Sequence, residues 1–177
     1  MFERYSEAAR RAIFFARRET LQRNSDAIEP CDLLRGLVTE PYPNSALLQH
    51  LHENRAQLPE SLRPGEMPCK PPQGRDVPLS DSSRKILLIA AKEANSDGNI
   101  TIDRDHLLRA VMRQEVAIEA SLREMGVSLR LVRKESTHRS QHSKVILWQI
   151  KKKSRPVLLI VLLVMVAAAL WYLHQQN

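Results

Sequence analysis

An internal duplication constrains the fold of this 177-residue chain more than any other feature. Residues 6–51 align with residues 80–125 at a constant offset of 74 and without a gap. The matched positions include Ser6 with Ser80, Arg10 with Arg84, Glu19 with Glu93, Ile28 with Ile102, Leu33 with Leu107 and Arg35 with Arg109. Two copies are too few for an extended solenoid. We therefore expect them to fold onto each other as one compact domain.

Each copy has the hydrophobic spacing of α-helices. Small and apolar residues recur every three or four positions within 9–16 and again within 86–94. Ser6 and Ser80 precede these two runs, and a serine hydroxyl at a helix start accepts a hydrogen bond from a first-turn amide. Both serines are therefore predicted N-caps.

Two further helices are predicted in each copy. One begins near Pro30 and, in the second copy, at Arg104, where Asp103 can act as the cap. Another runs over about 44–54 and 115–125. Only helices are predicted in the repeated part, so we expect an all-α fold.

The chain divides into four parts. Six prolines lie between the copies, and this density prevents a long helix there. We expect a double repeat at 1–136 (first copy about 6–54, proline-rich linker 56–78, second copy about 80–128), a basic segment at 137–156, an apolar segment at 157–173 and a short tail at 174–177.

The apolar segment 157–173 is predicted to be one transmembrane helix. It has no charged residue, and its seventeen residues would span roughly 25 Å as a helix, close to the hydrocarbon thickness of a bilayer. A buried core helix would normally show a polar face, which this segment lacks. Its predicted membrane-flanking residues are Lys151, Lys152, Lys153 and Arg155 on one side and Trp171 and Tyr172 on the other.

The basic flank sets the predicted orientation. Basic residues near a transmembrane helix favour the cytoplasmic side. The expectation is a single-pass, tail-anchored protein of the cytoplasmic membrane with its N-terminal domain in the cytoplasm. The start of the chain has no basic region followed by an apolar stretch, so no signal peptide is predicted.

Charge is concentrated outside the repeats. Residues 137–177 hold six basic and no acidic residues, which leaves 21 basic and 20 acidic residues in 1–136. Because the basicity lies beside an apolar segment, we expect membrane lipid rather than nucleic acid as the partner.

No catalytic or metal-binding pattern stands out. The sequence contains no P-loop pattern GxxxxGK[ST] and no CxxC pair, and Cys31 and Cys69 are expected to be free thiols in a reducing cytoplasm. We therefore expect no enzyme, no cofactor and no metal.

The segment MFERYSEAARRAIFFARRE, followed by LLRGL and repeated after a linker, resembles the N-terminal domain of Clp/Hsp100 ATPases, most closely the bacterial ClpC type. The resemblance covers about 1–134. It implies an all-α, pseudo-two-fold bundle that receives protein substrates and adaptors for an unfolding ring.

One motif departs from this resemblance. Where such domains carry Gly-Thr-Glu-His, this chain has EPCD at 29–32 and DRDH at 103–106. The glutamate, which in ClpC-type domains helps recognise phosphoarginine, falls on Cys31 and Asp105. Cysteine cannot pair with a guanidinium as a carboxylate does, so the first site is expected to be lost and the second conservatively altered. The candidate protein-binding residues are Phe2, Glu29, Cys31, Asp103, Asp105 and His106. For the three in the second copy, helix capping is the alternative role.

The sequence predicts a membrane-tethered protein-binding module that would recruit clients, adaptors or a separate Clp ATPase at the membrane. Two alternatives stay open. One is a structural protein that self-assembles at the membrane, and the other is binding of anionic lipid or nucleic acid through the basic segment 137–156.

Overall fold

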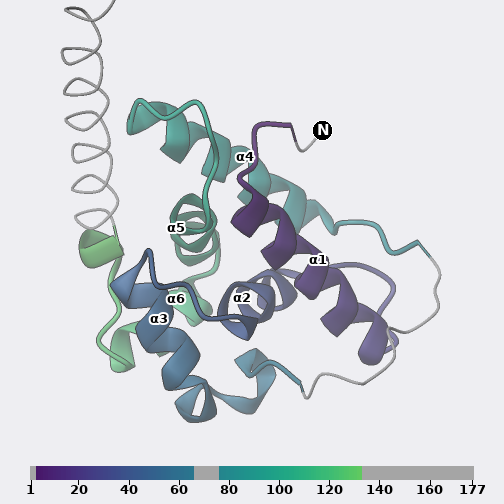
Figure 1. Ribbon diagram of the computed structural model, residues 1–177. Coiled ribbons are helices and arrows are strands. Elements are labelled where there is room, and N and C mark those ends of the chain that lie inside the picture. Colours follow the sequence, from purple (N-terminus) through teal and green to yellow (C-terminus); the bar gives the residue numbers. More distant parts are fainter. Residues whose placement is uncertain (1–2, 66–75, 133–177) are drawn as a thin grey trace, which may run out of the picture. The chain divides into compact units, whose positions relative to one another are not determined.

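A computed structural model describes residues 3–65 and 76–132 of the chain. Helices dominate these residues (Figure 1). In chain order they are α1 (Glu7–Gln22), α2 (Pro30–Thr39), α3 (Ala46–Glu53), the 3₁₀ helices η1 (Arg55–Gln57) and η2 (Glu60–Leu62), α4 (Asp81–Ser96), α5 (Arg104–Gln114) and α6 (Val116–Glu124). The predicted all-α fold is confirmed.

The two copies begin and end their first helices in the same way. The hydroxyls of Ser6 and Ser80 accept hydrogen bonds from the amides of Ala9 and Ser83, at 3.1 and 3.2 Å, so both predicted N-caps are confirmed. Both helices are followed by a residue with positive φ. This residue is Asn24 (54°) after α1 and Gly98 (69°) after α4, and the two lie 74 positions apart. Glycine and asparagine are the residues that tolerate this left-handed turn best.

Close helix packing holds each half together. α1 packs mainly against α2, and α4 packs mainly against α5. At the first of these contacts the backbones nearly touch, because a Cβ atom at Gly36 would lie 2.1 Å from the carbonyl oxygen of Ala12 and 2.7 Å from the amide nitrogen of Ala16. The second copy has Ala110 at the position equivalent to Gly36.

The halves interlock through two reciprocal backbone pairings. Tyr5 forms a parallel bridge with Ile102, and Ile28 forms the same bridge with Leu79. An offset of 74 converts each bridge into the other, since Tyr5 corresponds to Leu79 and Ile28 to Ile102. The residue shortly before the first helix of each copy therefore pairs with the other copy. This reciprocal pairing is expected of a pseudo-two-fold pair.

One hydrophobic core serves both halves. Its fully buried leucines include Leu34, Leu37, Leu48, Leu108 and Leu122, which come from helices on both sides of the linker. The predicted linker takes part as well. Apart from two three-residue 3₁₀ helices it forms no helix in its described residues, yet Leu58, Leu62 and Val77 are buried in the core. The sequence analysis did not anticipate that packing.

The predicted membrane anchor lies outside the described residues. Over residues 3–65 and 76–132, no helix has the length and apolar character needed to cross a membrane. The basic segment 137–156 and the apolar segment 157–173, with all the membrane-flanking residues named above, lie outside the described residues.

Candidate protein-binding surface

An open apolar groove runs along α1, and we call it the α1 groove. Its volume is about 380 Å³. The lining consists of Arg10, Ile13, Phe14 and Arg17 on α1, Ile28 after it, and Asp76, Val77 and Leu79 ahead of α4. The pairing of Ile28 with Leu79 closes one side of the groove, so the contact that joins the halves also shapes this surface.

Phe14 is a large, exposed apolar side chain that lines the α1 groove. It is 55% exposed and lies edge-on to Phe15, with ring centroids 5.8 Å apart. The position equivalent to Phe14 in the second copy is Leu88, which is 65% exposed. An exposed large apolar residue is unremarkable alone, but one beside an apolar groove marks a place where a partner can bury surface.

Arginines flank the apolar floor of this groove. Arg17 forms an exposed ion pair with Asp76 at 3.2 Å, whereas Arg10 has no ion-pair partner among the described residues. The groove therefore combines apolar area with an excess of positive charge. This combination suits a segment that carries apolar and acidic side chains together.

A second, polar cavity of about 500 Å³ lies where the halves meet. Asp103 is one of the residues that line it. Its Oδ1 accepts from the Ser6 hydroxyl at 2.8 Å, and its Oδ2 accepts from the Tyr42 hydroxyl at 2.7 Å. Asp103 thus binds both the start of α1 and the loop after α2, and its carboxylate is used to hold the two copies together.

Arg104 forms the floor of the polar cavity. It is only 3% exposed, donates to the carbonyl oxygens of Leu37 and Glu40, and places its guanidinium 4.7 Å from the centre of the Tyr42 ring. Burial lowers the pKa of Arg104, and the neighbouring Tyr42 and Glu40 oppose that shift. An arginine remains charged in such a site. Arg104 therefore supplies a fixed positive charge to the last carbonyls of α2.

The other second-copy candidates also have structural partners. The Nδ1 atom of His106 accepts from the Asp103 amide at 2.8 Å, which completes a capping box at the start of α5. Asp105 is 2% exposed. The capping role considered for Asp103 and His106 is confirmed, and whether a partner also uses these residues stays a prediction.

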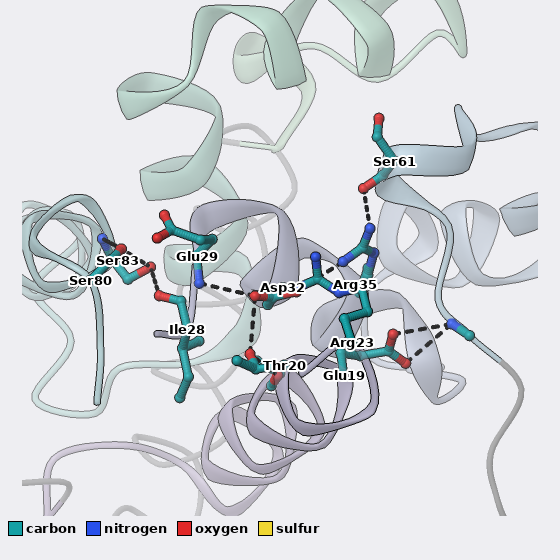
Figure 2. A network of polar contacts seen from close by, with 12 residues as sticks. Glu19, Thr20, Arg23, Ile28, Glu29, Asp32, Arg35, Ser61, Ser80 and Ser83 are labelled. Atoms are coloured by element: carbon teal, nitrogen blue, oxygen red, sulfur yellow. Dashed lines mark hydrogen bonds and ion pairs between the residues drawn. The ribbon is translucent and has the colours of Figure 1, made fainter. Parts of the chain in front are cut away.

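In the first copy, the predicted Glu29 is exposed and Cys31 is a half-buried free thiol. Phe2 lies outside the described residues. Between α1 and α2, Asp32 is fully buried and its Oδ2 accepts from the Thr20 hydroxyl and from the Glu29 amide, both at 3.0 Å. Figure 2 shows this network.

The same network lies next to Ile28, which closes the α1 groove, because Asp32 binds the amide of Glu29. Oδ1 of Asp32 also binds Arg23 and Arg35, so the start of α2 is tied to α1 by charge as well as by packing. Next to it, the Ser83 hydroxyl donates to the Ile28 carbonyl oxygen at 2.6 Å. Ile28 is thus bound by residues at the start of the second copy, and its neighbour Glu29 is bound by Asp32 of the first.

Sequence reasoning missed the α1 groove. The available signal was Phe14 itself, an aromatic residue at a helical position between Arg10 and Arg17, with Leu88 at the equivalent position in the second copy. Within the described residues, no three His, Cys, Asp or Glu side chains are grouped so that they could hold a metal ion.

The described residues form a duplicated helical bundle with an apolar groove and a polar cavity at its surface. The chain belongs to the Clp repeat (R) N-terminal domain family, whose sequence model matches residues 4–125. Domains of this family are protein-binding modules of Clp/Hsp100 chaperones. The resemblance stated from the sequence is confirmed at the level of the family.

Curated relatives include uncharacterized proteins of Mycobacterium tuberculosis and Mycobacterium bovis. Each is 32% identical over 115 residues, which is 64% of this chain and 45% of the relative. The chain thus spans about half the length of these relatives.

Solved structures share the fold. The N-terminal domain of the chaperone ClpD from Arabidopsis thaliana matches with a TM-score of 0.56 at 20% identity, over 80% of this chain and 97% of that one. The Hsp104 N-terminal domain from Candida albicans matches with a TM-score of 0.54 at 17% identity, over 76% and 89%.

Proposed function

We propose that this chain is a membrane-tethered protein-binding module, which captures accessible segments of client or adaptor proteins in the α1 groove. One observation carries the proposal, namely an apolar groove of about 380 Å³ with the exposed Phe14 on its rim. Membership of the Clp family supports the choice of protein as the ligand. Delivery of such clients to a separate Clp ATPase belongs to the same proposal.

The groove favours a particular kind of segment. Its volume is enough for one or two large apolar side chains, and Arg10 can pair with an acidic neighbour of such an anchor. An unfolded peptide with alternating apolar and glutamate residues is the natural probe.

Binding of this peptide by the full chain, followed by fluorescence anisotropy, tests the proposal. Phe14→Ser should weaken binding roughly tenfold, because burial of a large apolar side chain contributes about 1.5–3 kcal/mol. Val116→Ser is the matched control, since Val116 is 78% exposed but lies outside the groove. Equal affinity of wild type and Phe14→Ser, or no measurable binding by wild type, would remove the α1 groove from the proposal.

Tethering is tested separately. The segment 157–173 supports a membrane anchor by composition alone. We expect the full chain to stay in the membrane pellet in high salt and to need detergent for release, whereas a chain ending at Ser136 should be soluble. Release of the full chain by salt alone would exclude a spanning anchor and leave the binding experiment unaffected.

A further inference from the structure

A small cavity in the second copy is walled largely by arginine. It measures about 100 Å³ and is lined by Arg109 and Arg113 of α5, together with Leu129 and Arg130 beyond α6. A water molecule takes about 30 Å³ of liquid volume, so the cavity has room for roughly three waters. A nucleotide is too large for it, but a small anion is not.

Arg109 is buried at the base of this arginine cavity. It is 1% exposed, and its guanidinium contacts Asp97 at 2.5 Å and Glu93 at 3.4 Å. Its Nε nevertheless has no hydrogen-bond partner among the described residues. A buried donor without an acceptor is costly, and an anion in the cavity is the kind of group that would satisfy it.

The remaining wall carries uncompensated positive charge. Arg113 binds Glu93 at 2.8 Å through one Nη. Arg130 is exposed, and no carboxylate in residues 3–65 or 76–132 pairs with it. Three arginines therefore face two carboxylates, Glu93 and Asp97, which leaves an excess of one positive charge. Arginine remains protonated at any ordinary pH, so the excess is permanent.

The first copy lacks the excess of arginine. Arg35 corresponds to Arg109 and its Nε is likewise without a hydrogen-bond partner among the described residues, while its Nη2 donates to the Ser61 carbonyl oxygen at 2.5 Å and its Nη1 binds Asp32. Thr39 stands where the second copy has Arg113. The charge excess is therefore specific to the second copy and does not follow from the fold that the two copies share.

The geometry points to an oxyanion site of the phosphate class, in which Arg109, Arg113 and Arg130 hold a phosphate ion or the phosphoryl group of a partner. Guanidinium groups donate two parallel hydrogen bonds to phosphate oxygens, and three of them can surround one tetrahedral anion. This site is separate from the α1 groove, so the result of its test does not depend on the proposed function.

Binding of radiolabelled inorganic phosphate and of a phosphoserine peptide to the full chain, at constant ionic strength, tests the site. We expect saturable binding of at least one probe, at one per chain. Arg130→Gln, which breaks no ion pair among the described residues, should weaken it about tenfold, and Arg113→Gln with Arg130→Gln should weaken it further. Phosphate binding alone indicates a free anion, and peptide binding indicates a phosphorylated partner.

Arg123→Gln is the matched control. Arg123 is exposed and paired with Glu119 on α6, away from the cavity, so its loss should not change the affinity. Thermal unfolding without phosphate confirms that the variants are folded. The site is overturned if neither probe binds saturably, or if binding by the double variant equals that of wild type.

Discussion

At the scale of single residues, the close approach of α1 and α2 depends on Gly36. Any side chain there meets backbone atoms of α1 at 2.1 and 2.7 Å, and a rigid backbone cannot yield as a side chain end can. Gly36→Ala should therefore force α1 and α2 apart and cost about 2–3 kcal/mol of unfolding free energy. Denaturation by urea measures the loss.

Gly126→Ala is the matched substitution. A Cβ at Gly126 meets nothing within 4 Å, but its φ of +79° is unfavourable for alanine, so we expect a loss of only about 1 kcal/mol. Equal losses for the two variants would contradict a tight backbone contact between α1 and α2 at Gly36.

His106 predicts a pH dependence of stability. Burial lowers its pKa in the folded protein, Arg109 lowers it further, and Asp97 and Asp103 oppose the shift. Below pH of about 6.5 the unfolded chain therefore binds a proton that the folded protein excludes, and stability falls by up to about 1.4 kcal/mol per pH unit until the folded pKa is reached. As the pH falls from 7.5 to 5.5 we therefore expect stability to fall, by no more than about 1.4 kcal/mol from this residue.

Urea denaturation of variants at both pH values checks the assignment. Glutamine at a third helical position can accept the same capping hydrogen bond, so His106→Gln should fold and lose most of the pH dependence. His50→Gln should keep it, because His50 is exposed. An unchanged pH dependence in His106→Gln would show that other groups cause it.

At the scale of helices, the two copies place different polar pairs at the same two equivalent positions. The first copy pairs Arg23 after α1 with the buried Asp32, whereas the second pairs Asp97 with His106 at 3.4 Å. Positions 23 and 97, and positions 32 and 106, are equivalent by the offset of 74. The charge reversal from Arg23 to Asp97 is thus matched by replacement of the Asp32 carboxylate with His106, whose pKa is lowered by burial.

Replacing Asp97 and His106 of the second copy by the residues of the first copy tests that equivalence. His106→Asp alone places two carboxylates together in a buried site, and Asp97→Arg alone removes the closer of the two carboxylates that Arg109 contacts. We expect each to cost about 2–4 kcal/mol. The double variant recreates the arrangement of the first copy, in which Asp32 also binds Arg35, and should recover at least about 1 kcal/mol relative to additivity. A double-mutant cycle that shows simple additivity would contradict the interpretation.

These helices could largely be predicted from the sequence, because their starts and apolar spacing are local signals. Ser6 and Ser80 cap as serine chemistry requires, and Pro30 begins α2 as its ring geometry favours. The candidate site was harder to predict. The α1 groove depends on Ile28 meeting Leu79, a contact between residues far apart in the chain, and the burial of Asp105 depends on how α5 packs. No local sequence pattern predicts the groove or the burial of Asp105.

At the scale of the whole molecule, the reciprocal bridges make each half depend on the other. Tyr5 lies against Ile102, Leu79 lies against Ile28, and Arg104 of the second copy donates to carbonyls at the end of α2 in the first. A half alone would expose these groups together with its share of the common core. Domains of about 60 residues are already marginally stable, so we expect neither half to fold in isolation.

Cleaving the chain between the copies tests this dependence. A protease site inserted within 66–75 should give two fragments that remain associated and unfold in one cooperative transition in circular dichroism. Residues 1–65 or residues 76–177 expressed separately should lack such a transition, and mixing them should restore it. Independent folding of either fragment would mean that the duplicated units are separate domains. The α1 groove, which draws its walls from both copies, should then survive only when the fragments are combined, and peptide binding by the reassembled pair provides the second readout.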